Sequence, residues 1–395
     1  MKLNDIAYFV EDKISSENIK LDQYVTTDSL LQNKKGRTFA QNLPPQKCSL
    51  VHFKKGDVLL GNIRPYLKKI WYANIEGGCS QDVLVLRAKN NLESKFLYAL
   101  LMQDSFFDYE MKATKGSKMP RGDKSHIINF PCLDLNNKTE IGKLLSSLDD
   151  KIALNNRINA KLEQMAKRLY DYWFVQFDFP NADDKPYKST GGKMVWNEEL
   201  KREIPEGWEV GNLYDIAEYV NGLACQNYRP KESEKSLPVI KIREMNEGIT
   251  ADTEKVSASI PGKYRIYAGD ILFSWSASLE IKIWTGETGG LNQHIFKVIP
   301  KGYFSKGYVY QQLSAYLVNF QKMAESRKTT MGHITSDHIK QSRILIPPKE
   351  IISAFNQKTL SIFNYQLSIE KETQKLTALR DRLLPLLMNG QVVVE

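Results

Sequence analysis

The chain repeats itself at a nearly constant distance of about 212 residues. Residues 77–81 (GGCSQ) return as residues 289–293 (GGLNQ), and residues 56–60 (GDVLL) return as residues 269–273 (GDILF) with the distance longer by one. Self-similarity at a fixed distance indicates that a whole structural unit has been copied. The chain is therefore expected to be a tandem duplication that folds into two equivalent domains.

Each copy ends in a long stretch with the spacing of an amphipathic helix. Apolar residues fall mostly at steps of three and four, which is typical of a coiled-coil seam, and polar residues interrupt both patterns, near Asn155 and near Thr373. A single helix of this kind more often packs on its own domain, whereas two equivalent helices favour mutual pairing. The expected seam residues are Leu145, Leu148, Ile152, Leu162, Met165 and Leu169 in the first copy and Leu360, Phe363, Leu367, Leu376, Leu379 and Leu383 in the second.

The repeat and the two helical stretches divide the chain into five expected parts. Strand-like and helical stretches occur in both copies, so each globular domain is expected to mix strands with helices. Prolines and glycines among polar residues indicate a linker between the copies. The expected parts are a first domain at residues 1–140, a spacer helix at 141–178, the linker at 179–208, a second domain at 209–350, and a second spacer helix with the C-terminal tail at 351–395.

Charge and cysteine content narrow the class of protein. Lys and Arg number 55 against 46 Asp and Glu, a formal net charge of +9, which favours a polyanionic partner without naming one. The four cysteines are far apart and form no C-x-x-C pair, so neither a disulfide framework nor a zinc ribbon is indicated. No apolar run reaches the ~18 residues that a membrane span needs. The expected protein is cytoplasmic and soluble.

Signatures of catalysis are missing from the sequence. There is no G-x-G and no G-x-x-x-x-G-K-[ST], the usual phosphate-binding loops. His333 and His338 are five residues apart rather than the four that place two histidines on one helical face for zinc. We therefore expect no catalytic residue, no metal site and no cofactor in this chain.

A basic loop occurs at the same place in both copies. Residues 112–124 hold five cations and one anion among glycines and a proline, and residues 327–335 hold similar donors with more hydroxyls. Cations neutralise phosphates, whereas Arg, Ser and Thr side chains can also bind base edges. Either loop alone fits a solvated surface loop, but the same loop in both copies favours DNA contact. The expected contact residues are Lys115, Lys118, Arg121 and Lys124 in the first loop and Arg327, Lys328, Thr329, Thr330, His333 and Thr335 in the second.

A second candidate surface follows the repeated Gly-Asp strand. The first copy has Arg64, Tyr66, Lys68 and Lys69 there, and the second copy has Trp275. Divergence within a shared scaffold suits two domains that bind different targets. The alternative, that tryptophans in this region are core aromatics, stays open.

Several segments resemble one family, the specificity subunit of type I restriction–modification systems (HsdS). They are the GDIL segment at 269–272, KTTMGHI at 328–334, WFVQF at 173–177, IPEGW at 204–208 and LLPLLMNG at 383–390. The resemblance covers essentially the whole chain. The first copy departs from the family pattern, since its basic loop lacks the KTTMGHI motif.

The resemblance implies a non-catalytic DNA-binding subunit of a larger enzyme. Two target-recognition domains would each bind half of a split double-stranded DNA sequence. Two methyltransferase subunits (HsdM) would bind S-adenosylmethionine and methylate adenine, and two restriction subunits (HsdR) would use ATP and magnesium, so these cofactors belong to the partners. The expected fold class is α+β, with two tandem-duplicated mixed α/β target-recognition domains joined by two long helices that form an antiparallel coiled coil.

The geometry of DNA is compatible with that expectation. Two similar domains related by a pseudo-twofold axis can each meet a major groove in an equivalent orientation. A helix over residues 141–174 would be about 50 Å long and could hold half-sites apart by up to ~15 base pairs. We therefore expect a bipartite, asymmetric target with a fixed spacer. Two alternatives stay open: a stand-alone DNA-cleaving or DNA-methylating enzyme with an unrecognised site, and a coiled-coil adaptor that does not bind DNA.

Overall fold

The chain divides into two compact units, each built from more than one stretch of sequence or more than one sheet. The computed structural model describes residues 1–116, 118–276, 278–326 and 333–394. Unit 1 comprises Met1–Leu154 and Gln374–Glu395, and unit 2 comprises Asn155–Thr373. Each unit therefore holds one of the expected globular domains together with part of each long helix.

The first sheet of unit 1 is sandwiched between helices and a second sheet. Its antiparallel order is β1 (Ala7–Phe9), β8 (Val83–Ala88), β5 (Val58–Gly61) and β6 (Ile70–Tyr72). Leu84 and Leu86 pack in the core beneath α2 (Ser94–Leu101) and α3 (Asp104–Met111), whereas Val83 and Val85 pack in the core on the other face. Because successive strand residues point to opposite faces, a strand segment buried on both faces must be apolar at every position, as residues 83–86 of β8 are.

The first sheet of unit 2 has the same order. It runs β12 (Ala217–Asn221), β19 (Ile295–Pro300), β16 (Ile271–Ser274) and β17 (Glu280–Ile283). Ile271 and Phe273 pack with Leu313 and Phe320 of α8 (Lys306–Ser326), while Leu272 packs in a separate core on the opposite face. The predicted duplication is therefore present in the sheet topology.

The second sheets share three strands and differ in the fourth. In unit 1, β7 (Gly77–Cys79) lies between the parallel β3 (Tyr24–Val25) and the antiparallel β4 (Ser49–Phe53). In unit 2, β18 (Gly289–Leu291) lies between the parallel β13 (Ser236–Ile240) and the antiparallel β15 (Arg265–Ile266). The extra edge strand is β2 (Lys13–Ser15) on β4 in one unit and β14 (Lys255–Ser257) on β13 in the other, so the two copies have diverged on opposite edges of this sheet.

The remaining elements are short. Unit 1 also contains α1 (Leu3–Ile6) and α4 (Lys124–Ile127). Unit 2 also contains α6 (Leu213–Ile216), α7 (Ile242–Glu247), α9 (Ser336–Lys340) and the strand pair β11 (Glu209–Gly211) with β20 (Ile344–Ile346). The expected linker contains a hairpin of β9 (Met194–Asn197) and β10 (Arg202–Pro205), and Phe179 stacks on Trp208 at 5.3 Å within the unit 2 core.

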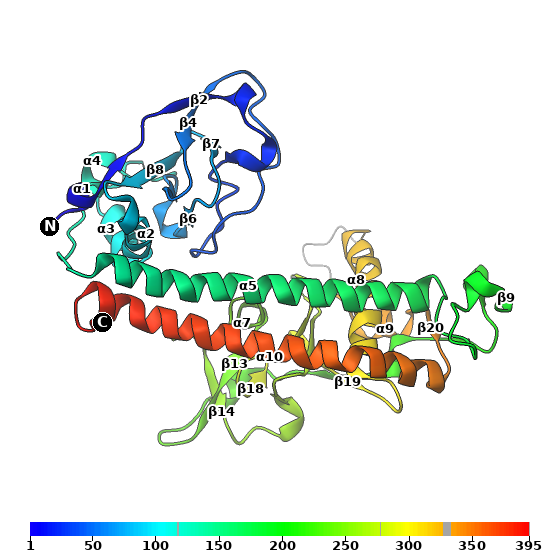
Figure 1. The fold of residues 1–395 in the computed structure, drawn as a ribbon. Helices are drawn as coiled ribbons and strands as arrows, with labels where there is room; N and C mark the ends of the chain where they lie inside the picture. The colour runs from blue at the N-terminus through cyan, green and yellow to red at the C-terminus, as the bar shows by residue number, and fades with distance from the viewer. Residues whose placement is uncertain (117, 277, 327–332, 395) are drawn as a thin grey trace. The chain divides into compact units, whose positions relative to one another are not determined.

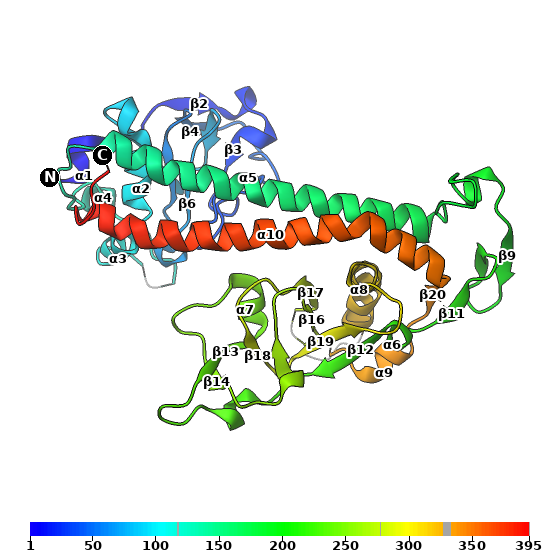
Figure 2. The ribbon, with the colours of Figure 1, turned by 60° about the horizontal axis from the view of Figure 1, so that its bottom comes forward.

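The two long helices are α5 (Lys138–Tyr170) and α10 (Lys349–Met388). In unit 1 the start of α5 packs against the end of α10, where Asp149 Oδ1 lies 2.9 Å from Arg380 Nη1. In unit 2 the end of α5 packs against the start of α10, where the Tyr170 ring lies 6.4 Å from the Phe355 ring. The pairing is therefore antiparallel, and the two helices lie side by side within each unit (Figures 1 and 2). The predicted fold class is confirmed.

Polar residues occupy the middle of this helix pair, where the sequence pattern was interrupted. Asn155 is fully buried, and its Nδ2 donates to Glu372 Oε2 at 2.9 Å. Asn159 Nδ2 donates to Glu370 Oε2 at 3.1 Å. A polar layer within an apolar seam favours one register of two helices, because slippage would leave these groups buried without partners.

Three of the twelve expected seam residues are wrong. Met165, Leu360 and Leu379 are exposed by 55%, 49% and 46%. The inward positions are held by their neighbours Ala166, Thr359 and Arg380, because a straight helix drifts relative to a strict seven-residue repeat. Leu145 is buried, and the expected seam residues that are partly buried are Leu148, Ile152, Leu162, Leu169, Phe363, Leu367, Leu376 and Leu383.

Both chain ends belong to unit 1. The N-terminal amino group of Met1 donates to the Cys132 carbonyl oxygen at 3.1 Å, and Asn137 Nδ2 donates to the Val394 carbonyl oxygen at 3.1 Å. None of the described helices is both long enough and apolar enough to cross a membrane.

Candidate nucleic-acid interface

Three loops of unit 1 meet at one end of its first sheet. They contribute Asn62 after β5, Asp82 before β8 and Arg121 before α4. The Asn62 backbone N–H donates to the Asp82 carbonyl oxygen at 2.9 Å, and the Gly122 N–H donates to the Asn62 carbonyl oxygen at 3.2 Å. Arg121 Nη2 lies 3.1 Å from Asp82 Oδ1. We call Asn62, Asp82 and Arg121 the unit 1 triplet.

The same three loops meet in unit 2 with different side chains. Trp275 N–H donates to the His294 carbonyl oxygen at 3.3 Å, and Ile334 N–H donates to the Trp275 carbonyl oxygen at 3.0 Å. The Trp275 ring lies 5.5 Å from that of His294 and 5.6 Å from that of His333. Trp275, His294 and His333, the unit 2 triplet, stand at the repeat positions of Asn62, Asp82 and Arg121. The backbone frame is thus shared while the chemistry of the side chains differs.

Sequence reasoning found only part of each triplet. Arg121, Trp275 and His333 were expected as contact residues, whereas Asn62, Asp82 and His294 were missed. The repeat carried the missing signal, because Asp82 and His294 directly follow the aligned GGCSQ and GGLNQ segments.

Backbone hydrogen bonds join two residues of the unit 1 basic loop beside the triplet. Lys115 and Arg121 exchange two backbone hydrogen bonds, both 3.0 Å long. Lys115 Nζ lies 2.7 Å from Asp123 Oδ2, and this contact, with hydrogen bonds from Ser125, holds the pKa of the Asp123 carboxyl below its usual value. Lys118 is exposed and has no hydrogen bond or ion pair among the described residues. Its ammonium group is therefore available to a phosphate.

Lys124, the fourth expected contact of this loop, begins α4. Its Nζ lies 5.5 Å from the centre of the Phe9 ring, the distance of a cation–π contact. Its side chain is exposed, so it is oriented by the ring without being withdrawn from solvent.

The segment after β5 lies against the basic loop. Arg64 N–H donates to the Pro120 carbonyl oxygen at 2.8 Å. Arg64 and Lys68 have φ values of +53° and +51°, conformations that cost a non-glycine residue of order 1 kcal/mol and are often found at functional sites. Tyr66 is 50% exposed, and the Arg64 side chain is exposed as well. The Arg64 guanidinium therefore adds a second cation beside the loop that holds Arg121.

Two of the expected lysines in this segment are held within the unit. Lys68 Nζ lies 2.6 Å from Asp104 Oδ1, an oxygen shared with Lys34 at 2.8 Å. Lys69 Nζ donates to the Thr27 carbonyl oxygen.

Trp275 is positioned by the core and by hydrogen bonds. It is partly buried against the unit 2 core, and its Nε1 donates to Asn221 Oδ1 at 3.0 Å. Two other tryptophans of this candidate region, Trp71 in unit 1 and Trp284 in unit 2, are buried, with 8% and 6% exposure. They are core aromatics, and only Trp275 lies at the loop triplet.

The second basic loop is described only at its end. Arg327, Lys328, Thr329 and Thr330 lie outside the described residues. Thr335 is exposed and precedes α9 as Asp123 precedes α4, and its N–H donates to His338 Nδ1 at 3.0 Å. Across the described ranges, no group of three or more His, Cys, Asp or Glu side chains is placed to hold a metal ion.

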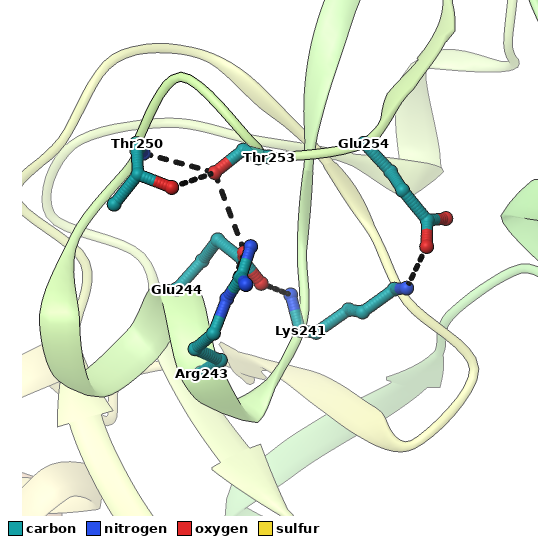
Figure 3. Close-up of polar contacts among 6 residues, drawn as sticks. All are labelled: Lys241, Arg243, Glu244, Thr250, Thr253 and Glu254. Carbon is teal, nitrogen blue, oxygen red and sulfur yellow. Dashed lines mark hydrogen bonds and ion pairs between the residues drawn. The ribbon is translucent and has the colours of Figure 1, made fainter. Parts of the chain in front are cut away.

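A buried carboxylate orients an arginine on α7 (Figure 3). Glu244 is 1% exposed, and its Oε1 accepts hydrogen bonds from Arg243 Nη2 at 2.7 Å and Nε at 3.0 Å. Thr253 Oγ1 donates to the same oxygen at 3.3 Å, and Lys241 N–H donates to Oε2 at 3.2 Å. The Arg243 side chain is half-exposed, so the cluster presents a guanidinium in a fixed orientation.

Comparison with known proteins places these features in one family. The type I restriction modification DNA specificity domain matches residues 1–164 and 205–380. The type I restriction enzyme HindI specificity subunit of Haemophilus influenzae is 26% identical over 93% of this chain and 94% of its own length. The MjaIX specificity subunit of Methanocaldococcus jannaschii is 25% identical over 89% of this chain and 81% of its own length. In fold, the chain is similar to the crystal structure of the type I restriction–modification S subunit from M. genitalium, with a TM-score of 0.55 at 13% identity, covering 97% of this chain and 94% of that one.

Proposed function

Because the chain belongs to the type I restriction modification DNA specificity family, we propose that it gives such a system its sequence specificity. It binds a bipartite, asymmetric double-stranded DNA target, and each of its two domains reads one half. The unit 1 triplet and the unit 2 triplet are the centres of the two reading surfaces.

The observation that carries this proposal is that the two triplets share their backbone hydrogen bonds but have different side chains. The bond from Gly122 N–H to the Asn62 carbonyl oxygen has its counterpart in the bond from Ile334 N–H to the Trp275 carbonyl oxygen. A common frame would present both triplets to DNA in the same way, and different donors and acceptors would then select different bases. A split target with unlike halves follows from this arrangement.

The cations around the triplets supply the contacts that do not depend on sequence. Lys118 and Arg64 are exposed beside Arg121, and such side chains neutralise phosphates and fix the register of a protein on the duplex. Arg121 and Asn62 carry the groups that bind base edges in the major groove. Within one surface, some side chains would therefore position the protein on the DNA backbone and others would select the bases.

The catalytic steps are assigned to partner subunits. Two methyltransferase subunits would bring S-adenosylmethionine and methylate adenine, and two restriction subunits would bring the ATP and magnesium sites. The chain would place these subunits on its target without taking part in bond breaking. This assignment is supported by the family and by relatives named specificity subunits of type I restriction enzymes.

Selection from a random duplex library tests the proposal. The full-length chain is assembled with its methyltransferase subunits, incubated with duplexes containing 30 randomised base pairs, as a rough design length that exceeds two half-sites and their spacer, and bound DNA is sequenced. We expect a motif of two short, unlike halves separated by unspecified bases. Binding without any enriched motif contradicts the proposal, as does cleavage or methylation by the chain alone that a single carboxylate substitution abolishes.

A further inference from the structure

A carboxyl group is buried directly beneath the unit 1 triplet. Glu110, on α3, is 1% exposed, and its Oε1 is buried without a hydrogen-bond partner among the described residues. Burial raises the pKa of the Glu110 carboxyl to about 8. Near neutral pH the group is therefore mainly the neutral acid, which carries a proton that it can donate.

A second unpartnered oxygen lies beside the first. Asn62 Oδ1 is buried and has no hydrogen-bond partner among the described residues. Gly122 brings the two oxygens together, because a Cβ on this glycine would lie 2.4 Å from Glu110 Oε1 and 3.0 Å from Asn62 Oδ1. Only a residue without a side chain lets the acid and the amide approach the same point of the backbone.

In the orientation that the structure gives Asn62, with its amide oxygen toward Glu110, one direct hydrogen bond can satisfy both oxygens. Two oxygens without a proton between them cannot bond, and each buried unpaired oxygen costs roughly 1–3 kcal/mol. The neutral acid of Glu110 has the O–H donor, and the amide oxygen of Asn62 is an acceptor.

We propose that Glu110 is a positioning residue that donates a hydrogen bond to Asn62 Oδ1 and so turns Asn62 Nδ2 outward, as the donor that reads an acceptor on a base edge. This inference rests on the proposed function, since it assigns a role within the same reading surface. With the amide oxygen engaged, Asn62 cannot make the two-bond contact to adenine that uses both ends of an amide. Its outward N–H groups instead fit guanine O6 or N7, adenine N7 or thymine O4.

The pairing of Glu110 with Asn62 is specific to unit 1. In unit 2 the positions of Asn62 and Gly122 are taken by Trp275 and Ile334, and the repeat position of Glu110 is the exposed Lys322. Ile334 is buried, so the space that the acid and amide share in unit 1 has no counterpart there. A change at Glu110 should therefore alter the reading of one base pair in one half of the target.

The test compares base preferences of four full-length chains assembled with methyltransferase subunits: wild type, Glu110→Gln, Glu110→Leu and Asn62→Ala. Bound duplexes from the random library are sequenced, and preference is scored at every position. The Gln variant keeps the donor through its Nε2 and should enrich the wild-type motif. The Leu and Ala variants should each lose about fivefold to tenfold in preference, the value of one hydrogen bond, at the same single base pair, with the other half-site unchanged.

Several results would overturn the inference. They are full preference in the Leu and Ala variants, losses at different base pairs in the two, loss spread over the whole half-site in both, or a Gln variant that behaves like the Leu variant. Asn62 is partly exposed, so its variant reports on the contact even where a core change at Glu110 prevents folding. A wild-type chain that enriches no motif would instead sink the proposed function itself.

Discussion

Asn62 and Trp275 hold the same position in the two copies of the repeat. The backbone carbonyl oxygen of each accepts one bond from the loop that precedes a short helix, from Gly122 at 3.2 Å and from Ile334 at 3.0 Å. An amide and an indole on one frame can neither make the same hydrogen bonds nor fill the same space. This relationship connects the duplicated fold to a target whose halves differ.

Replacing Arg121 by alanine should weaken binding to one half of the target. Arg121 pairs with Asp82 at 3.1 Å while its side chain stays 56% exposed, so the guanidinium is oriented and accessible. An arginine that contacts a base edge contributes roughly 1–3 kcal/mol of discrimination, which corresponds to a loss of about fivefold to about 150-fold. Competition binding against duplexes mutated in either half measures the effect.

Lys89→Ala is the matched control for that experiment. Lys89 is exposed at the opposite end of β8, about 20 Å from Asp82 at 3.3 Å per residue. It should leave the preference for both halves unchanged. Equal losses in the two variants would mean that only total charge matters, and Arg121 would leave the list of reading residues. The same design with Arg327→Ala, where loss of affinity is likewise expected, addresses the second basic loop.

Glu110→Gln should stabilise the protein increasingly as pH rises. The folded-state pKa of Glu110 is raised from its usual 4.5 to about 8, so between these values the native state keeps a proton that the unfolded state releases. Wild-type stability therefore falls with rising pH in this window, by up to about 1.4 kcal/mol per pH unit, and glutamine removes this dependence. Urea unfolding at pH 5 and pH 8 measures the difference.

The exposed Glu11 provides the control for the pH series. Glu11→Gln removes one carboxyl from the surface rather than from the core, and its stability curve should run parallel to that of wild type. Parallel curves for Glu110→Gln as well would show that Glu110 is not held as the neutral acid.

Arg380→Met should destabilise unit 1. Arg380 Nη1 lies 2.9 Å from Asp149 Oδ1, and burial raises the pKa of Asp149 above its usual value despite this cation. Removing the cation leaves a mostly buried carboxyl without its charge partner, at a cost of about 2 kcal/mol. The urea midpoint should fall relative to wild type, whereas Arg382→Met, two residues along α10 and exposed, should change it little. Identical midpoints for the two variants would remove the ion pair from the account of helix pairing.

Shortening both helices should shorten the unspecified spacer of the target. α5 has 33 residues, a length of about 50 Å at 1.5 Å per residue. Removing about two turns, roughly seven residues, from each of α5 and α10 would shorten the pair by about 10 Å, or about three base pairs. Methylation-site mapping should show the same two halves with the shorter spacer. An unchanged spacer would reject the helices as its ruler.

Much of the fold was predictable because the repeat is visible in the sequence. The GGCSQ and GGLNQ segments mark β7 and β18, and proline-free stretches of three-and-four spacing mark α5 and most of α10. The seam was harder, because Thr359 and Asn155 face inward through hydrogen bonds that an apolar pattern does not reveal. Sequence spacing therefore predicted where the two helices lie better than it predicted which of their residues face each other.

The candidate site was less predictable than the fold. Its triplets come from three loops that are distant in the sequence and meet only because the sheet order brings β5 beside β8. Charge pointed to Arg121, but nothing in the pattern separated Arg64, which is exposed, from Lys68, which an acidic neighbour engages. The relation of Glu110 to Asn62 depends on the close approach at Gly122, which is a property of packing.

Long-read methylation mapping in cells that express this chain with its methyltransferase subunits tests the central claim most directly. The account predicts adenine methylation at one bipartite motif with unlike halves, present only when the chain is present, with the preference for one half reduced by Arg121→Ala. Methylation that persists without the chain, or a motif that is continuous or has two identical halves, would contradict it.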